Sequence, residues 1–69
     1  MLQLTAVIFR DDQTTLLVAE CPELGVASQG STEEEALTNL KEATELYLEA
    51  FPERPLRAAT VTRFELADA

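Results

Sequence analysis

Few side chains in this sequence could perform catalysis. The chain has one cysteine, Cys21, and no histidine. Because a cysteine nucleophile is usually activated by a neighbouring histidine, we expect Cys21 to pack at the end of a strand. Asp11 and Asp12 are adjacent carboxylates, the groups that act in general acid–base catalysis, but they lie in a polar turn where solvation keeps both ionised. We therefore expect no catalytic residue and no enzymatic activity.

Metal and cofactor chemistry lacks its usual residues as well. A structural zinc site needs about four cysteine or histidine ligands, and one chain offers only Cys21. A loop that cradles phosphates needs several glycines and a lysine, whereas Gly25 and Gly30 are the only glycines of the sequence. We expect no metal site and no cofactor.

The charge of the chain is strongly negative and unevenly placed. The formal net charge is -8, from 13 acidic and 5 basic residues. Such a protein repels nucleic acid at long range, so we expect no direct nucleic-acid binding. Residues 31–51 carry six glutamates and one lysine. An acidic segment of this kind is either a solvated surface or a docking surface for a basic partner.

Alternating apolar residues predict a small sheet. Residues 2–10 have the period-two pattern of a strand, a polar turn follows, and residues 15–20 resume an apolar run, which together indicate an antiparallel hairpin. Pro22 ends the second strand and Gly25 allows the chain to turn back into a short third strand over residues 26–29. Residues 57–66 are expected to form a fourth strand, at an edge or between subunits.

A helix is predicted between the third and fourth strands. Thr32 and Glu35 have the spacing of a capping box, in which each side chain satisfies a backbone N–H at the helix start. Pro52 disfavours helical geometry at Phe51, so the helix should end there. The order is β-β-β-α-β, and the expected fold class is α+β, an antiparallel sheet with one amphipathic helix packed on one face.

The helix has two distinct faces. At helical spacing, one side carries charge, and Glu42, Glu45 and Glu49 of that side face outward. Glu45 and Glu49 are like charges four residues apart, which destabilises the free helix slightly and which a basic partner would relieve. The apolar side that should pack on the sheet consists of Ala36, Leu37, Leu40, Ala43, Tyr47, Leu48 and Phe51.

The length of the chain bounds its stability. With 69 residues it is expected to be a single domain that buries only about 60% of its unfolded surface. Self-association as a homodimer or homotetramer is the expected source of further stability. The unpaired Cys21, together with an N-terminal segment that does not have the features of a secretory leader, predicts a cytoplasmic protein. No segment approaches the length of a membrane span.

The middle of the chain resembles the HicB-type antitoxin domain. That family has a loop of proline, an acidic residue, leucine, proline and glycine, of which this chain lacks the second proline. A glycine and a threonine before EEA follow, then an asparagine with an EA pair after it, and a Tyr-Leu near the helix end. The matching positions are Pro22, Glu23, Leu24, Gly25, Gly30, Thr32, Glu34, Glu35, Ala36, Asn39, Glu42, Ala43, Tyr47 and Leu48.

The resemblance implies binding rather than catalysis. Proteins of this family have a β-β-β-α-β partial ribonuclease H fold and neutralise a small basic HicA-type toxin that cleaves messenger RNA. The resemblance implies that residues 1–69 are a single HicB-like domain of a toxin–antitoxin system, without the C-terminal DNA-binding domain that the family often carries. The expected partner-binding residues are Pro22, Glu23, Leu24 and Gly25 of the loop and Glu42, Glu45 and Glu49 of the helix.

Two alternatives remain open at this point. The chain could be an orphan homo-oligomeric HicB-like domain that binds another protein or a small ligand. It could also be a metal-dependent nuclease, because the ribonuclease H fold supports that chemistry. The first predicted strand carries no carboxylate before Arg10, where that fold places an essential one, which argues against the nuclease.

Overall fold

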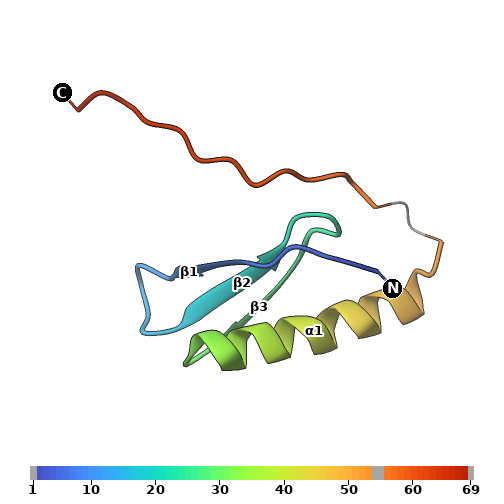
Figure 1. Ribbon diagram of the computed structural model, residues 1–69. Coiled ribbons are helices and arrows are strands. Elements are labelled where there is room, and N and C mark those ends of the chain that lie inside the picture. Colours follow the sequence, from blue (N-terminus) through green and yellow to red (C-terminus); the bar gives the residue numbers. More distant parts are fainter. Residues whose placement is uncertain (1, 54–55, 69) are drawn as a thin grey trace.

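The chain folds into a three-stranded antiparallel sheet with one helix against it (Figure 1). A computed structural model describes residues 2–53 and 56–68, and Met1, Arg54, Pro55 and Ala69 lie outside them. The sheet has the order β1-β2-β3, and the predicted α+β class and β-β-β-α order are confirmed. The elements are β1 (Val7–Arg10), β2 (Leu17–Cys21), β3 (Val26–Gly30) and α1 (Glu33–Ala50).

The first strand is shorter than predicted. β1 pairs with β2 only from Val7, opposite Glu20, to Arg10, opposite Leu17. β2 ends at Cys21 and the chain then turns, so residues 2–6 have no neighbouring strand within this hairpin. The amide of Thr5 instead donates to the Glu23 carboxylate, at 3.0 and 3.1 Å from its two oxygens. Residues 2–6 therefore continue β1 as an extended segment held by a side chain.

A side chain organises the glycine-free turn between β1 and β2. The Asp11 carboxylate accepts hydrogen bonds from the Gln13 amide and the Thr14 hydroxyl, both at 3.2 Å. The Asp11 amide donates to the Leu16 carbonyl at 3.0 Å and closes the turn. Aspartate commonly builds turns in this way. The turn occupies the residues before Leu17, which is why β2 begins later than the predicted residue 15.

The helix begins and ends where its sequence predicts. The Thr32 hydroxyl accepts a hydrogen bond from the Glu35 amide at 3.0 Å, and the Glu35 carboxylate accepts one from the Ser31 amide at 2.9 Å. The capping box is thus confirmed, with the return bond one residue before the cap. Phe51 ends the helix, and its amide donates to the Tyr47 carbonyl at 2.9 Å.

A thin core joins the helix to the sheet. The buried apolar residues come from β2, the following turn and α1. Thr44 is also buried, although as a polar residue it was not among those predicted to pack on the sheet. Phe51 was expected on the packed side but is 54% exposed, because it lies just after the last residue of the helix. Its ring centroid lies 5.2 Å from that of Tyr47, with the two rings tilted by 45°. The buried apolar residues are Ala19, Cys21, Leu24, Ala36 and Leu40.

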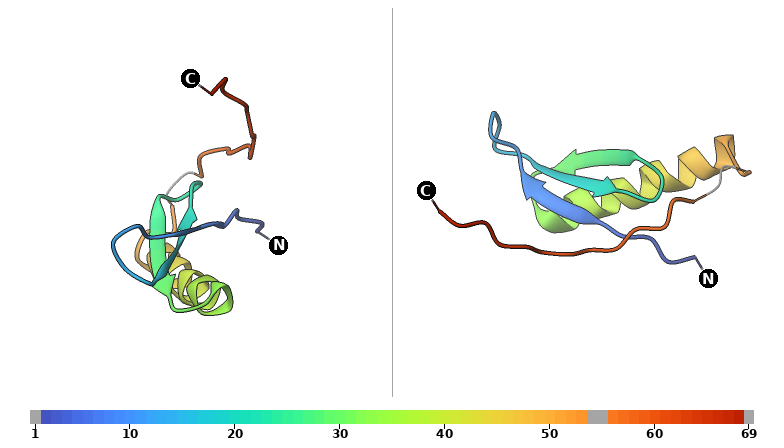
Figure 2. Two further views of the ribbon diagram at one scale, coloured as in Figure 1. Left: turned by 90° about the vertical axis from the view of Figure 1, so that its left-hand side faces the viewer. Right: turned by 90° about the horizontal axis from the view of Figure 1, so that it is seen from above.

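The predicted fourth strand is absent from the single chain. Residues 57–66 are assigned to no strand, and all of them are exposed. Figures 1 and 2 show the segment running beyond β1 in the same direction as β1, separated from the sheet. Its start is attached by the Arg57 amide, which donates to the Glu23 carbonyl at 3.1 Å. The alternation of apolar residues favoured a strand, but strand formation needs a neighbour, and in this structure the segment pairs with no strand.

The helix register predicts a contrast between two leucines of α1. Leu40 is 4% exposed and Leu46 is 60% exposed. We expect Leu40→Asp to lower the free energy of unfolding by more than about 4 kcal/mol, because it buries a charge in the core, and to leave the domain unfolded. Leu46→Asp, the same substitution on the same helix, should cost less than about 1 kcal/mol. Urea unfolding followed by circular dichroism measures both, and a folded Leu40→Asp variant would contradict the register.

Candidate binding surface

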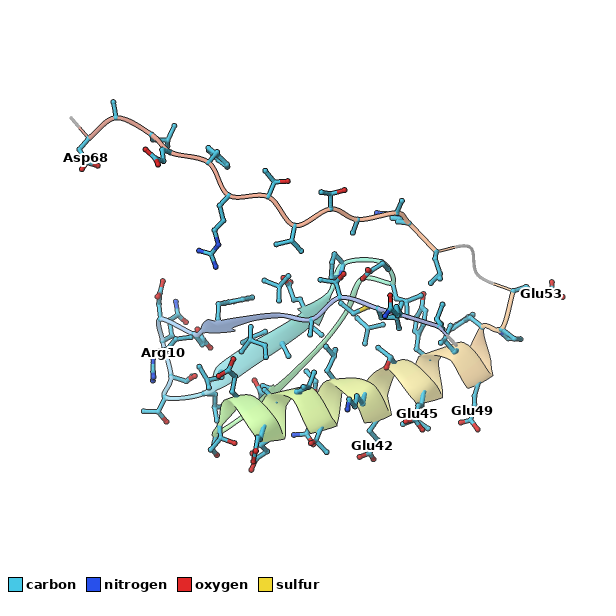
Figure 3. All side chains as sticks on the ribbon, in the orientation of Figure 1. Arg10, Glu42, Glu45, Glu49, Glu53 and Asp68 are labelled. Carbon is cyan, nitrogen blue, oxygen red and sulfur yellow. The ribbon has the colours of Figure 1, made fainter. Side chains whose placement is uncertain are left out.

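The outward face of α1 gathers the three predicted glutamates. Glu42, Glu45 and Glu49 are exposed and point away from the sheet (Figure 3). Their spacing of three and four residues places them on one side of the helix, over about 10 Å of its length. The structure therefore brings these three predicted residues together.

Sequence reasoning missed an apolar residue among these glutamates. Leu46 lies four residues after Glu42 and one residue after Glu45, and it is the most exposed leucine of the helix. With its neighbours it lines a shallow depression of about 470 Å³. The sequence could have indicated this residue, because a leucine among the charged positions of a helical wheel is an apolar side chain exposed to water. We call Glu42, Glu45, Leu46 and Glu49 the acidic helix face.

The predicted loop residues have divided roles. Leu24 is buried in the core, and its amide and that of Gly25 donate to the Cys21 carbonyl at 3.3 and 2.8 Å. Gly25 has a φ of +71°, a conformation that other residues rarely adopt, which explains the glycine there. Pro22 and Gly25 are exposed. The loop thus offers a partner mainly Pro22 and Gly25, and it lies at the end of the sheet rather than beside the acidic helix face.

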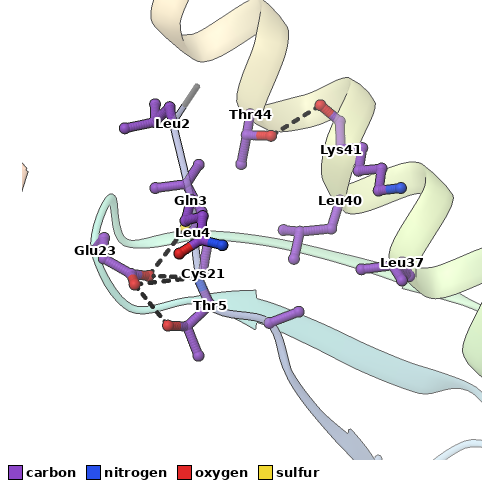
Figure 4. A pocket seen from close by; sticks show the side chains of 11 residues that line it. Leu2, Gln3, Leu4, Thr5, Cys21, Glu23, Leu37, Leu40, Lys41 and Thr44 are labelled. Carbon is purple, nitrogen blue, oxygen red and sulfur yellow. Dashed lines mark hydrogen bonds between the residues drawn. The ribbon is translucent and has the colours of Figure 1, made fainter. Parts of the chain in front are cut away.

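Glu23 ties the loop to the N-terminal segment (Figure 4). Its carboxylate accepts a hydrogen bond from the Thr5 hydroxyl at 2.6 Å, in addition to those from the Thr5 amide. These hydrogen bonds favour the ionised form, first through the Thr5 hydroxyl and then through its amide, and lower the pKa of Glu23. The Glu23 side chain is therefore occupied within the chain itself.

Cys21 is a packing residue, as predicted. It is 1% exposed and ends β2. Burial raises the pKa of the Cys21 thiol, and the thiol donates to the Glu23 carboxylate at 3.6 Å. A buried thiol with a raised pKa carries little thiolate and is a poor nucleophile.

A groove separates residues 2–6 from the helix. Its volume is about 600 Å³, and Cys21 and Glu23 lie at one end (Figure 4). The side formed by the helix presents Leu37, Leu40 and Thr44, and Leu2 and Leu4 lie opposite. The lining is mixed, and its charged residues are Glu23 and Lys41.

The other candidates for chemistry, Asp11 and Asp12, lie in the turn after β1. The Asp11 carboxylate is engaged in its turn, and the neighbouring Asp12 is exposed. Within residues 2–53 and 56–68, no three histidine, cysteine or acidic side chains are grouped so that they could hold a metal ion. The same part of the chain offers no helix with the length and apolar character that crossing a bilayer requires.

Comparisons of the chain with protein-family models, with curated proteins and with solved structures found no match.

The Glu23 site predicts how stability changes with pH. Because the folded-state pKa of Glu23 lies below its ordinary value of 4.5, the carboxylate adds stability above that pH and loses it as the pH falls through the folded-state pKa. Glu23→Gln, which never ionises, should be less stable than the parent at pH 7. In urea unfolding the difference should shrink as the pH falls below 4.5 and through the folded-state pKa.

The matched control is Glu20→Gln, which removes an exposed glutamate of β2. It should change the free energy of unfolding by no more than about 0.5 kcal/mol at pH 7. A difference between Glu23→Gln and the parent that stays constant between pH 7 and pH 3 would contradict the role of the ionised carboxylate.

Proposed function

We propose that this protein is a non-enzymatic binding module that captures a small basic protein with its acidic helix face, in the manner of a HicB-type antitoxin and a HicA-type toxin. The observation that carries the proposal is the exposed Leu46 surrounded by Glu42, Glu45 and Glu49 on α1. A basic partner with an apolar side chain among its cations is the complement of that surface.

The charges of this face favour association with cations. Glu42 and Glu45 are three residues apart and Glu45 and Glu49 are four apart, so each pair repels in the free protein by a few tenths of a kcal/mol. A lysine or arginine brought between two of them removes that repulsion. Complementary charge of this kind acts mainly by raising the rate of association, and salt weakens it.

Leu46 supplies apolar surface that a partner can bury. Interfaces owe much of their affinity to a few apolar or aromatic anchors that become fully desolvated, while charged residues at the rim contribute less. A leucine at the centre of three glutamates has that arrangement. Burial of its side chain is worth roughly 1.5–3 kcal/mol, which is comparable to several exposed ion pairs.

The resemblance of residues 22–48 to the HicB-type antitoxin domain supports this class of partner. The EEA, Asn39 and Glu42–Ala43 positions that carry the resemblance belong to α1, the element that bears the acidic helix face. The cytoplasm, where a single cysteine stays reduced, is the compartment that fits this function.

The test is co-purification with a small basic toxin-like protein encoded beside this one. We expect a complex at low salt whose dissociation constant rises as salt is added. Leu46→Asp and the triple variant Glu42→Gln, Glu45→Gln, Glu49→Gln should each weaken binding roughly tenfold or more, while the helix remains folded. Toxin activity measured on messenger RNA should recover in proportion to the lost binding.

The control variant separates a local surface from net charge. Asp12→Asn, Glu20→Gln and Glu53→Gln remove three exposed charges elsewhere and change the net charge by the same amount. This variant should bind as the parent does. Equal weakening by both triple variants would overturn the acidic helix face as the docking site. The absence of any complex at low salt would instead favour the orphan domain that binds another protein or a small ligand.

A further inference from the structure

Residues 56–68, which we call the C-terminal arm, leave the body of the protein without covering it. All of them are exposed, including Val61 at 69%, Phe64 at 82% and Leu66 at 80%. Isolated apolar side chains are common on surfaces, but three within six residues of an extended segment mark an interaction site. We propose that the C-terminal arm is a strand donated to a second copy of this chain, where it adds to the open edge of β1.

The size of the single chain supports a missing partner. Its radius of gyration is 13.9 Å, whereas a compact chain of this length has about 11 Å. It exposes 5917 Å² of surface, about 1,600 Å² more than the roughly 4,300 Å² expected for a compact protein of 7.6 kDa. A stable interface removes about 800 Å² from each partner. Exchange of arms between two copies is large enough to form such an interface.

The arm alternates most clearly near its end. Phe64 and Leu66 are even-numbered, and the charged Arg63 and Glu65 between them are odd-numbered. The pattern is incomplete elsewhere, because Val61 is odd-numbered and Thr60, Thr62 and Asp68 are even-numbered. Successive side chains of a strand point to opposite faces of a sheet. The arm as a strand would therefore place Phe64 and Leu66 on one face and Arg63 and Glu65 on the other.

The edge of β1 is a suitable acceptor. In the order β1-β2-β3, no strand within the described residues pairs with the outer side of β1, whose backbone groups are therefore free to pair. The helix packs mainly against β2 and β3, so an open groove lies between the helix and residues 2–6. A strand added beside β1 would direct its alternate side chains towards that groove. There they could bury Leu2, which is exposed, and Leu4, which is half-buried.

Charge favours a second copy of this chain as the occupant. The C-terminal arm has two arginines and two acidic residues and is neutral, whereas the body carries all of the net negative charge. Contact between two bodies would oppose like charges, but contact between an arm and a body does not. A two-fold axis makes the exchange reciprocal, because each copy gives one arm and receives one. This inference does not depend on the proposed function, since the acidic helix face lies on the other side of the molecule (Figure 3).

Sedimentation equilibrium of the full chain tests the exchange. We expect a dimer of twice 7.6 kDa at micromolar concentration. Phe64→Asp with Leu66→Asp should raise the dimer dissociation constant about 30-fold or more, as loss of an interface anchor does. The control, Ala59→Asp with Ala67→Asp, adds the same charge to the other face of the arm and should leave the dimer intact.

The decisive measurement is an isotope-filtered NOE spectrum of labelled and unlabelled wild-type chains mixed in equal amounts. We expect contacts between Phe64 or Leu66 of one copy and residues 2–10 of the other. These contacts do not depend on whether any variant folds. A monomeric wild type, including one whose arm pairs with its own β1, would overturn the proposal. So would a dimer without these contacts between copies, or one equally weakened by the control variant.

Discussion

The close approach of α1 to the end of β3 constrains the rest of this structure. Gly30 ends β3, and a Cβ at that position would lie 2.5 Å from the amide nitrogen of Ala36, which leaves no room for a side chain. Ala36 on α1 and Ala19 on β2 are both fully buried in the core. Because Gly30 has no side chain, the start of the helix can approach the end of β3 closely. The capping box at Thr32 fixes where the helix starts and so where it crosses the sheet.

The core of the single chain holds few large side chains. The largest fully buried side chain is that of Cys21, and all three phenylalanines of the chain lie outside the core. Phe9 is 44% exposed, on the face of the sheet opposite the helix, and Phe51 and Phe64 are more exposed still. The hydrophobic free energy available to the single chain is therefore small, since it scales with the apolar area removed from water. The large apolar side chains remain available for contacts with other chains.

Features that depend on residues close in sequence are predicted, and features that depend on distant segments are not. The start of α1 depends on Thr32 and Glu35, which are three residues apart, and it is predicted to the residue. The length of β1 and the state of the C-terminal arm depend on which distant segment lies beside them, and alternation of apolar residues carries no information about that neighbour. Leu46 was not predicted, because the helical wheel was used to find the buried apolar side, and Leu46 lies on the charged side.

The two open surfaces of the molecule would influence each other through charge. In a dimer joined by its arms, two bodies that are both strongly acidic are held together, and their mutual repulsion opposes assembly. A basic protein bound to each acidic helix face neutralises part of that charge, so partner binding would strengthen the dimer and, by reciprocity, the dimer would bind its partners more tightly. Salt would act in opposite directions on the two contacts, since it screens the repulsion between bodies and the attraction of the partner alike. Arm exchange that relies on Phe64 and Leu66 would therefore persist at salt concentrations that release a basic partner from Glu42, Glu45 and Glu49.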